Sequence, residues 1–178
     1  MSDKGLREVV AADTTVSDID GEAGRLWYAG YEIADLAEHA TFEEVVYLLH
    51  HARLPNQDEL DELNELLIEN RDLSPFLTQL MSTLAQQTSP MSMLRTSISA
   101  VSAYDPDGWD ESPEAQYRKA MRLIAKTPAM IAYYERMRTR RELVPPHPKL
   151  PHAANFLYML SGEEPGHDDA DALDTTFI

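Results

Sequence analysis

Five helix-start signals follow one another from Thr41 onward, and they constrain the fold of this chain more than any other feature. Two are capping boxes, in which a cap residue and a glutamate three positions later bind each other's amides: Thr41 with Glu44, and Asn56 with Glu59. Three others place serine at the cap and proline at the first helical position, at Ser74-Pro75, Ser89-Pro90 and Ser112-Pro113. Apolar residues at helical spacing follow, so the sequence predicts a mainly α fold.

The first thirty residues have a different pattern. Residues 9–16 alternate in two interleaved rows, which is typical of an extended segment. Asp20-Gly21 and Gly24 are turn residues, and Leu26-Trp27-Tyr28 has the composition of a short returning strand. We therefore expect a small β-hairpin or meander within residues 1–32 and helices over residues 33–178.

Proline, glycine and helix-cap residues also predict the boundaries of the later helices. The helix from Pro90 should run to about residue 104, and the helix from Pro113 to about residue 142, with a kink or division at Pro128. Four prolines between residues 145 and 151 predict a stiff, extended connector. One amphipathic helix should follow over residues 153–160, ended by Gly162, and a last one should begin near Asp168.

Charge and composition exclude several classes of partner. The chain contains 31 acidic and 15 basic side chains, a net charge of −16, and such a chain repels the phosphates of nucleic acids. It has no cysteine, which excludes disulfides and thiol chemistry. No apolar run is long enough to span a membrane, and no signal core opens the sequence. We expect a cytoplasmic protein without nucleic-acid or membrane partners.

The basic residues are mostly arginine, since only four of the 15 are lysine. Abundant carboxylates with few lysines are typical of a salt-rich, halophilic cytoplasm, where hydrated acids keep a surface soluble. An acidic protein from an ordinary cytoplasm has the same composition, so both interpretations stay open. The acids between residues 58 and 69 fall opposite the leucines of the same helix, which predicts a solvated face.

No motif for catalysis, cofactor binding or metal binding stands out. His50-His51 lies at a predicted helix end, where a cation is favoured by the helix dipole. His167 precedes two aspartates, but adjacent residues rarely converge on one ion. The chain contains no GxGxxG, GxxxxGK[ST], HExxH or GxSxG sequence. We therefore assign no catalytic, cofactor-binding or metal-binding residue.

Five stretches in order along the chain resemble the citrate synthase family, which includes the 2-methylcitrate synthases. They are Asp18-Ile19-Asp20-Gly21 with Tyr28-Ala29-Gly30-Tyr31, Thr41 to Leu49, Pro90-Met91-Ser92-Met93-Leu94-Arg95-Thr96, Ile124-Ala125-Lys126-Thr127-Pro128, and His152 to Gly162. The third is similar to the family's H-P-M-x-x-L-R-T, with Ser89 in place of the histidine. The resemblance implies the N-terminal part of a citrate-synthase-like helical large domain with a small N-terminal β-hairpin.

The resemblance also implies an activity, the condensation of acetyl-CoA with oxaloacetate to give citrate and CoA at the entry of the tricarboxylic acid cycle. No metal or prosthetic group is implied. The family's catalytic groups are two histidines, in L-H-G and P-G-[FY]-G-H motifs, and an aspartate later in the sequence. These motifs do not occur in this chain. We therefore expect residues 1–178 to be an N-terminal half that lacks the small domain and is inactive alone.

Two alternatives stay open. A 2-methylcitrate synthase would use propionyl-CoA in place of acetyl-CoA, and the acyl pocket that distinguishes the two enzymes is not expected within this half. A truncated paralogue would instead be a non-catalytic, dimerising helical protein.

By the same resemblance, the helices that begin at Pro90 and Pro113 pack across the twofold axis of a homodimer. Two faces of small and medium apolar side chains fit that role. The predicted dimer-interface residues are Ser97, Ala100, Val101 and Tyr104 on the first helix, and Met121, Ile124 and Ile131 on the second. The alternative is that both faces pack within their own subunit.

Overall fold

The computed structural model describes residues 13–178, and most of them are helical. A sheet of three short strands comes first: β1 (Ser17–Asp20), β2 (Arg25–Tyr28) and β3 (Tyr31–Glu32). The helices are α1 (Ile33–His39), α2 (Phe42–His51), α3 (Gln57–Glu69), α4 (Pro75–Leu84), α5 (Pro90–Val101), α6 (Pro113–Arg138), α7 (His152–Ser161) and α8 (His167–Phe177). A 3₁₀ turn, Ser102–Tyr104, extends α5. The predicted mainly α fold with a small N-terminal sheet is confirmed.

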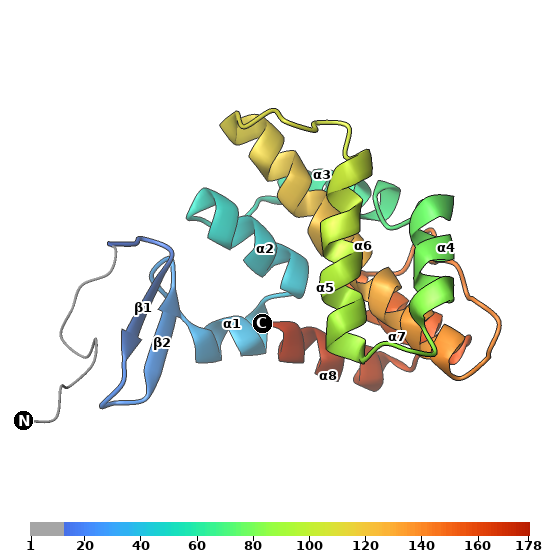
Figure 1. Cartoon of the computed structure of the whole chain (residues 1–178). Helices are drawn as coiled ribbons and strands as arrows, with labels where there is room; N and C mark the ends of the chain where they lie inside the picture. Colours follow the sequence, from blue (N-terminus) through green and yellow to red (C-terminus); the bar gives the residue numbers. More distant parts are fainter. Residues whose placement is uncertain (1–12) are drawn as a thin grey trace, which may run out of the picture.

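The three strands form an antiparallel meander that projects from the helices (Figure 1). Ser17 pairs with Tyr28, and Asp20 pairs with Arg25. The Asp20 carboxylate closes the first turn, because it accepts two backbone amides at 3.0 and 2.9 Å. Helix α1 packs against β2 and β3 and joins the sheet to α2.

The extended segment predicted over residues 9–16 is only partly confirmed. Its residues 9–12 lie outside the described residues, and residues 13–16 form no strand. One backbone hydrogen bond continues the pairing, from the amide of Ala29 to the carbonyl of Val16 at 2.8 Å. The ladder stops there because the opposite chain turns at Ala29 and Gly30, whose φ angles are +46° and +90°.

The five predicted helix starts are confirmed by their cap hydrogen bonds. The Thr41 hydroxyl accepts the amide of Glu44 at 3.3 Å, and the Glu44 carboxylate accepts the amide of Thr41 at 2.7 Å. Asn56 and Glu59 make the same reciprocal pair at 3.0 and 2.9 Å. A serine hydroxyl caps each of the three proline-initiated helices, α4, α5 and α6. The acidic face of α3 is exposed, as predicted.

One prediction about α6 was wrong, since the helix ends at Arg138 rather than near residue 142. Of the kink or division predicted at Pro128, the division does not occur, because α6 is continuous through this buried residue. Packing on several sides holds the helix across the missing proline amide. The helix ends early because Arg140 adopts a left-handed conformation, with φ +57°, and the amide of Arg141 binds back to the carbonyl of Arg136 at 2.8 Å.

Within residues 13–178, no helix combines the length and the apolar character needed to cross a membrane.

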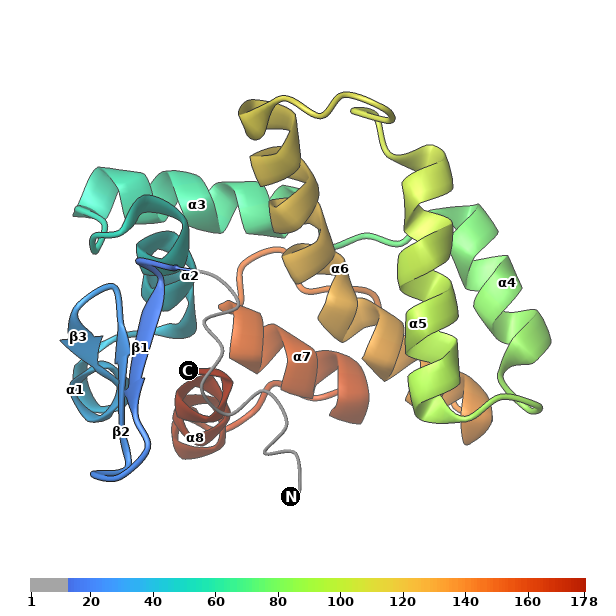
Figure 2. The ribbon, with the colours of Figure 1, turned by 60° about the vertical axis from the view of Figure 1, so that its left-hand side comes forward.

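Helix α6 runs through the middle of the molecule, and α3, α4, α5 and α7 pack around it (Figure 2). Three of the four core clusters in the described residues contain side chains of α6. It contributes Tyr134 to the cluster under α4 and α5, Met121 to the cluster with α3, and Ala129 to the cluster with α7. The fourth cluster, around Leu36 and Leu48, joins α1 to α2. The helical layer therefore depends on one central helix.

Arg136 fastens the end of this central helix. Its side chain lies almost wholly inside the protein, at 7% exposure. The guanidinium donates to the carbonyl of Leu160 at 2.8 Å and to that of Met159 at 3.4 Å, and its Nε donates to the carbonyl of Glu142. One side chain therefore links α6, the following connector and the last turn of α7.

Replacing Arg136 by methionine should lower the free energy of unfolding by about 2–4 kcal/mol, because it leaves buried carbonyls without a donor. Arg138→Met is the matched control, since Arg138 is half exposed and pairs with Glu135 on the surface. The control should cost no more than about 0.5 kcal/mol. Urea unfolding followed by circular dichroism measures both. Equal losses in the two variants would contradict the role given to Arg136.

Candidate functional site

The four predicted interface residues of α5 and its 3₁₀ turn lie at different depths. Ser97 is fully buried at 0% exposure, and Ala100 and Val101 are partly buried against the cluster under α4 and α5. Tyr104 is 60% exposed and packs against Phe76 of α4, with ring centroids 4.7 Å apart. Only Tyr104 among the four presents most of its side chain to solvent.

The three predicted residues of α6 also differ in depth. Met121 is fully buried beneath α3, and Ile124 is partly buried beside it. Ile131 is 38% exposed. Ile124 and Ile131 both line the apolar cleft described below. The assignment of these residues to a dimer interface stays a prediction.

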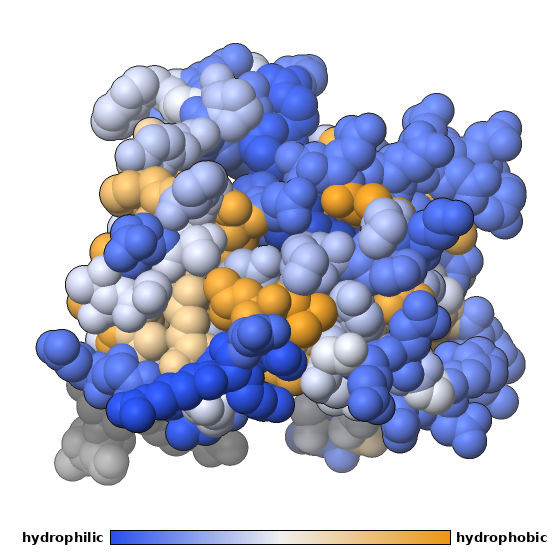
Figure 3. Space-filling model, turned by 90° about the vertical axis from the view of Figure 1, so that its right-hand side faces the viewer, coloured by the Kyte–Doolittle hydropathy of each residue, from blue (hydrophilic) through white to orange (hydrophobic). Residues whose placement is uncertain are grey.

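The apolar side chains that α5 exposes are ones that the sequence analysis did not select. Met91 is 73% exposed and Ile98 is 38% exposed. They are seven residues apart, with the exposed Arg95 between them, so all three fall on one stripe of the helix. Figure 3 shows that apolar groups also interrupt the hydrophilic surface on the side of the molecule that carries α4. The signal available in the sequence was the spacing of Met91 and Ile98, which places both on one stripe of the helix.

An apolar cleft of about 290 Å³ opens where α2, α6, α7 and α8 meet. Its lining residues come from all four helices: Phe42, Ile124, Thr127, Pro128, Ile131, His152, Phe156 and Phe177. Three of them form an aromatic cluster, in which Phe42 stacks on His152 with ring centroids 4.8 Å apart and meets Phe177 edge to face at 5.5 Å. Residues far apart in the sequence build this surface, so local sequence pattern could not reveal it.

His152 is the one titratable side chain in the lining of the cleft. It is 3% exposed, and its Nδ1 has no hydrogen-bond partner within the described residues. Burial and the nearby Arg71 lower its pKa to about 4, so the imidazole is neutral at pH 7. Its backbone amide donates to the buried carboxylate of Glu43 at 2.9 Å. The ring therefore acts as an aromatic wall of the cleft rather than as a cation.

Asp174 of α8 lies beside the cleft and caps α2. Its carboxylate accepts the amide of Phe42 at 3.0 Å. Burial raises its pKa to about 6 against the opposing hydrogen bond from Phe42, and the carboxylates of Glu43, Asp171 and Glu44 make smaller contributions in the same direction as burial. The pKa of Asp174 therefore lies closer to neutral pH than that of an ordinary aspartate.

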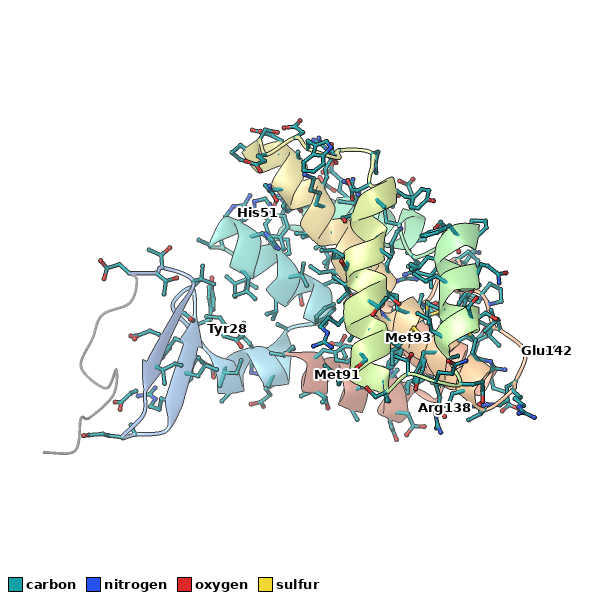
Figure 4. The ribbon with its side chains drawn as sticks, in the orientation of Figure 1. Tyr28, His51, Met91, Met93, Arg138 and Glu142 are labelled. Carbon is teal, nitrogen blue, oxygen red and sulfur yellow. The ribbon has the colours of Figure 1, made fainter. Side chains whose placement is uncertain are left out.

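The other histidine clusters carry no sign of a metal site. His50 and His51 lie at the end of α2, as predicted, and pack against Tyr117 of α6 at 5.3 and 5.5 Å (Figure 4). Burial, and then the neighbouring His51, lower the pKa of His50, which disfavours the charged helix cap expected from the sequence. His167 Nδ1 lies 3.1 Å from Asp171 on an exposed face. Residues 13–178 contain no group of three or more metal-ligating side chains.

Asp174→Asn should make the stability less dependent on pH. The pKa of Asp174 is higher in the folded protein than in the unfolded chain. The protonated carboxyl therefore makes its full contribution to the stability of the wild type below about pH 4, and this contribution is lost as pH rises through about 6. Asparagine can still accept the Phe42 amide but carries no charge to desolvate. We expect the variant to gain about 1 kcal/mol over wild type at pH 7.5 and nothing at pH 4, after allowance for partial solvent screening.

Thermal unfolding across pH 4–8 tests this, with Asp168→Asn in the exposed first turn of α8 as the control. A constant difference between Asp174→Asn and wild type at every pH would show that the carboxyl does not titrate in this window.

Comparison with known proteins identifies the family. The family model described as "Citrate synthase, C-terminal domain" matches residues 5–178. The chain is 45% identical over 179 aligned residues to the citrate synthase of Haloferax volcanii, covering 98% of this chain and 47% of that protein. It is 33% identical to a citrate/2-methylcitrate synthase of Bacillus subtilis, with the same two coverages. The chain spans about half the length of the curated relatives it matches.

Solved structures give the same result. The crystal structure of citrate synthase from Pyrobaculum aerophilum matches with a TM-score of 0.90 and 38% identity, over 97% of this chain and 45% of that chain. A ternary complex of citrate synthase from Thermoplasma acidophilum with carboxymethyl coenzyme A and oxaloacetate matches with a TM-score of 0.89 and 25% identity, over the same shares. The sequence and structure matches both extend over nearly the whole of this chain, which therefore belongs to the citrate synthase family.

Proposed function

We propose that this chain is part of a cytoplasmic citrate synthase that condenses acetyl-CoA with oxaloacetate to give citrate and CoA. The observation that carries the proposal is the 45% identity to the citrate synthase of Haloferax volcanii over 98% of the chain. The ternary complex of the Thermoplasma acidophilum enzyme, with a CoA derivative and oxaloacetate bound, supports the same pair of substrates.

In this proposal the chemistry is carbon–carbon bond formation followed by hydrolysis. A base removes a methyl proton from acetyl-CoA, and the resulting enol carbon attacks the ketone carbon of oxaloacetate, whose oxygen takes up a proton. Water then cleaves the thioester of citryl-CoA and releases citrate and CoA. The family's histidine and aspartate motifs for these steps do not occur in residues 1–178. The role proposed for this segment is therefore that of scaffold and dimer interface.

The dimer proposal rests on apolar side chains of α5 and α6 that are exposed to solvent. Met91 and Ile98 form an exposed apolar stripe of α5, and Tyr104 of the following 3₁₀ turn is also exposed, where it packs against Phe76 of α4. Ile131 of α6 adds a further exposed apolar side chain. A strip that one subunit leaves in water is suited to burial against the same strip of a second subunit.

A second candidate is a 2-methylcitrate synthase that uses propionyl-CoA. The relative from Bacillus subtilis named citrate/2-methylcitrate synthase supports it, but at 33% identity rather than 45%. Citrate synthase is therefore the first proposal.

Residues 1–178 alone should release no CoA from acetyl-CoA in the presence of oxaloacetate, because the chain lacks the family's catalytic motifs. Thiol release measured with and without oxaloacetate tests this. The complete reading frame that contains residues 1–178 should be assayed in parallel with acetyl-CoA and propionyl-CoA. Oxaloacetate-dependent release by the complete product supports citrate synthase, and a preference for propionyl-CoA supports the alternative. A complete product without activity on either substrate supports a non-catalytic helical protein.

Ile98→Glu should weaken the homodimer by at least about tenfold in Kd, because it places a carboxylate in an apolar contact. The fold itself should survive, since Ile98 is already 38% exposed. Thr96→Glu is the matched control, because Thr96 is exposed on another face of the same helix. Sedimentation of wild type and both variants over a range of concentrations measures the effect. An equal Kd of the dimer in all three proteins would show that α5 does not lie at the interface.

A further inference from the structure

Two buried, oppositely charged side chains lie near each other without a direct contact. Glu43 of α2 is 4% exposed, and Arg71, in the loop between α3 and α4, is 2% exposed. Burial lowers the pKa of Arg71, and the charge of the nearby Glu43 opposes this shift. Within residues 13–178, however, the hydrogen bonds of both side chains go to backbone groups. Buried charges are normally paired or fully hydrogen-bonded, so this arrangement requires a further partner.

The guanidinium of Arg71 has a donor to spare. Its Nη1 donates to the carbonyls of Leu150 at 2.8 Å and His147 at 3.3 Å, in the proline-rich connector before α7. Its Nε is buried and has no hydrogen-bond partner in the described part of the chain. Because the guanidinium is a rigid planar fork, the Nε–H bond points away from the edge that Nη1 occupies. One edge of the fork therefore holds the connector, and the opposite edge is left for another acceptor.

The carboxylate of Glu43 has acceptor capacity to spare. Its Oε1 accepts the backbone amide of His152 at 2.9 Å, at the first residue of α7. An ionised carboxylate offers about four acceptor positions, so one amide leaves most of them open. A small molecule that accepts from Arg71 and donates to Glu43 would satisfy both side chains.

The two side chains line the same cavity, which has a volume of about 220 Å³. The cavity lies between α2, α3 and the end of the connector, and Thr41 and Asn64 are further polar residues of its lining. A buried water needs only about 10–15 Å³ of such space and roughly two to four polar partners. Both the space and the partners are therefore present.

We propose that this cavity binds an ordered water molecule that bridges the guanidinium of Arg71 and the carboxylate of Glu43. Water is the ligand that suits both signs of charge, because its oxygen accepts from Arg71 while one of its hydrogens is donated to Glu43. An anion would be repelled by Glu43, and a cation would be repelled by Arg71 and by Lys149, which also lines the cavity.

The bridge connects segments that share no secondary structure. Glu43 holds the first amide of α7 against α2, and Arg71 holds two carbonyls of the connector that leads into α7. The water joins these two contacts into one polar network. The start of α7 is then fixed both from α2 and from the loop between α3 and α4.

Nuclear magnetic resonance of the chain tests the proposal. The Nε–H of Arg71 should show a nuclear Overhauser effect to a long-lived water, and a rotating-frame spectrum separates this effect from proton exchange. Arg71→Lys identifies the signal, because lysine has no Nε–H group. Arg138 is the internal control, since its Nε–H donates to Glu135 on the exposed surface and should show no long-lived water. An Arg71 signal without a long-lived water contact would overturn the proposal.

Two variants of Glu43 test the second partner of the water. Glu43→Gln keeps an oxygen that accepts from both the His152 amide and water, so the water signal should remain. Glu43→Met has a similar length but no oxygen, so the signal should be lost. An equally strong signal in Glu43→Met would show that Glu43 does not bind the water.

A crystal structure of the wild type decides the question even if Glu43→Met does not fold. The proposal requires a water within hydrogen-bond distance of both the Arg71 guanidinium and the Glu43 carboxylate. A direct ion pair between the two side chains, or an anion bound in the cavity, would overturn it.

Discussion

The burial of α6 on several sides is the constraint on which the rest of the structure depends. A helix surrounded in this way needs short side chains wherever a neighbour approaches closely, and Ala125, Ala129 and Ala132 provide them. Longer side chains such as Met121 and Met130 fill the space between the helices. The same enclosure explains why Pro128 does not break the helix, because packing compensates for the lost backbone hydrogen bond.

Three buried or partly buried cations of this acidic protein bind backbone carbonyls, whereas Arg122 binds the carboxylates of Asp105 and Asp107. Arg71 donates to the carbonyls of His147 and Leu150 at 3.3 and 2.8 Å, and Lys126 donates to that of Asn70 at 2.6 Å. Burial lowers the pKa of Lys126, so this contact is maintained against a desolvation cost. Together with Arg136, these side chains connect loops to helices, and the excess of acids stays at the surface.

Helix starts could be predicted from the sequence because their signals are local. Thr41 and Asn56 bind amides three residues away, so the relevant chemistry is visible in four consecutive letters. The end of α6 depends on the left-handed Arg140, for which arginine carries no signal. The exposed face of α5 was not predicted, because the positions of α4 and α6 decide that Ser97 is buried and Ile98 is exposed. The apolar cleft depends on Phe42 and Phe177, which lie far apart in the sequence and meet only in the fold.

The hydrogen bond from the Phe42 amide to Asp174 spans 132 positions of the chain. During synthesis, α2 can therefore form its own capping box long before the ribosome has released the residue that satisfies its first amide. Contacts of such high separation slow folding, since a long loop must close before they form. The early helices of this protein must remain partly stabilised until residue 174 has emerged, which makes them natural sites for chaperone binding on the nascent chain.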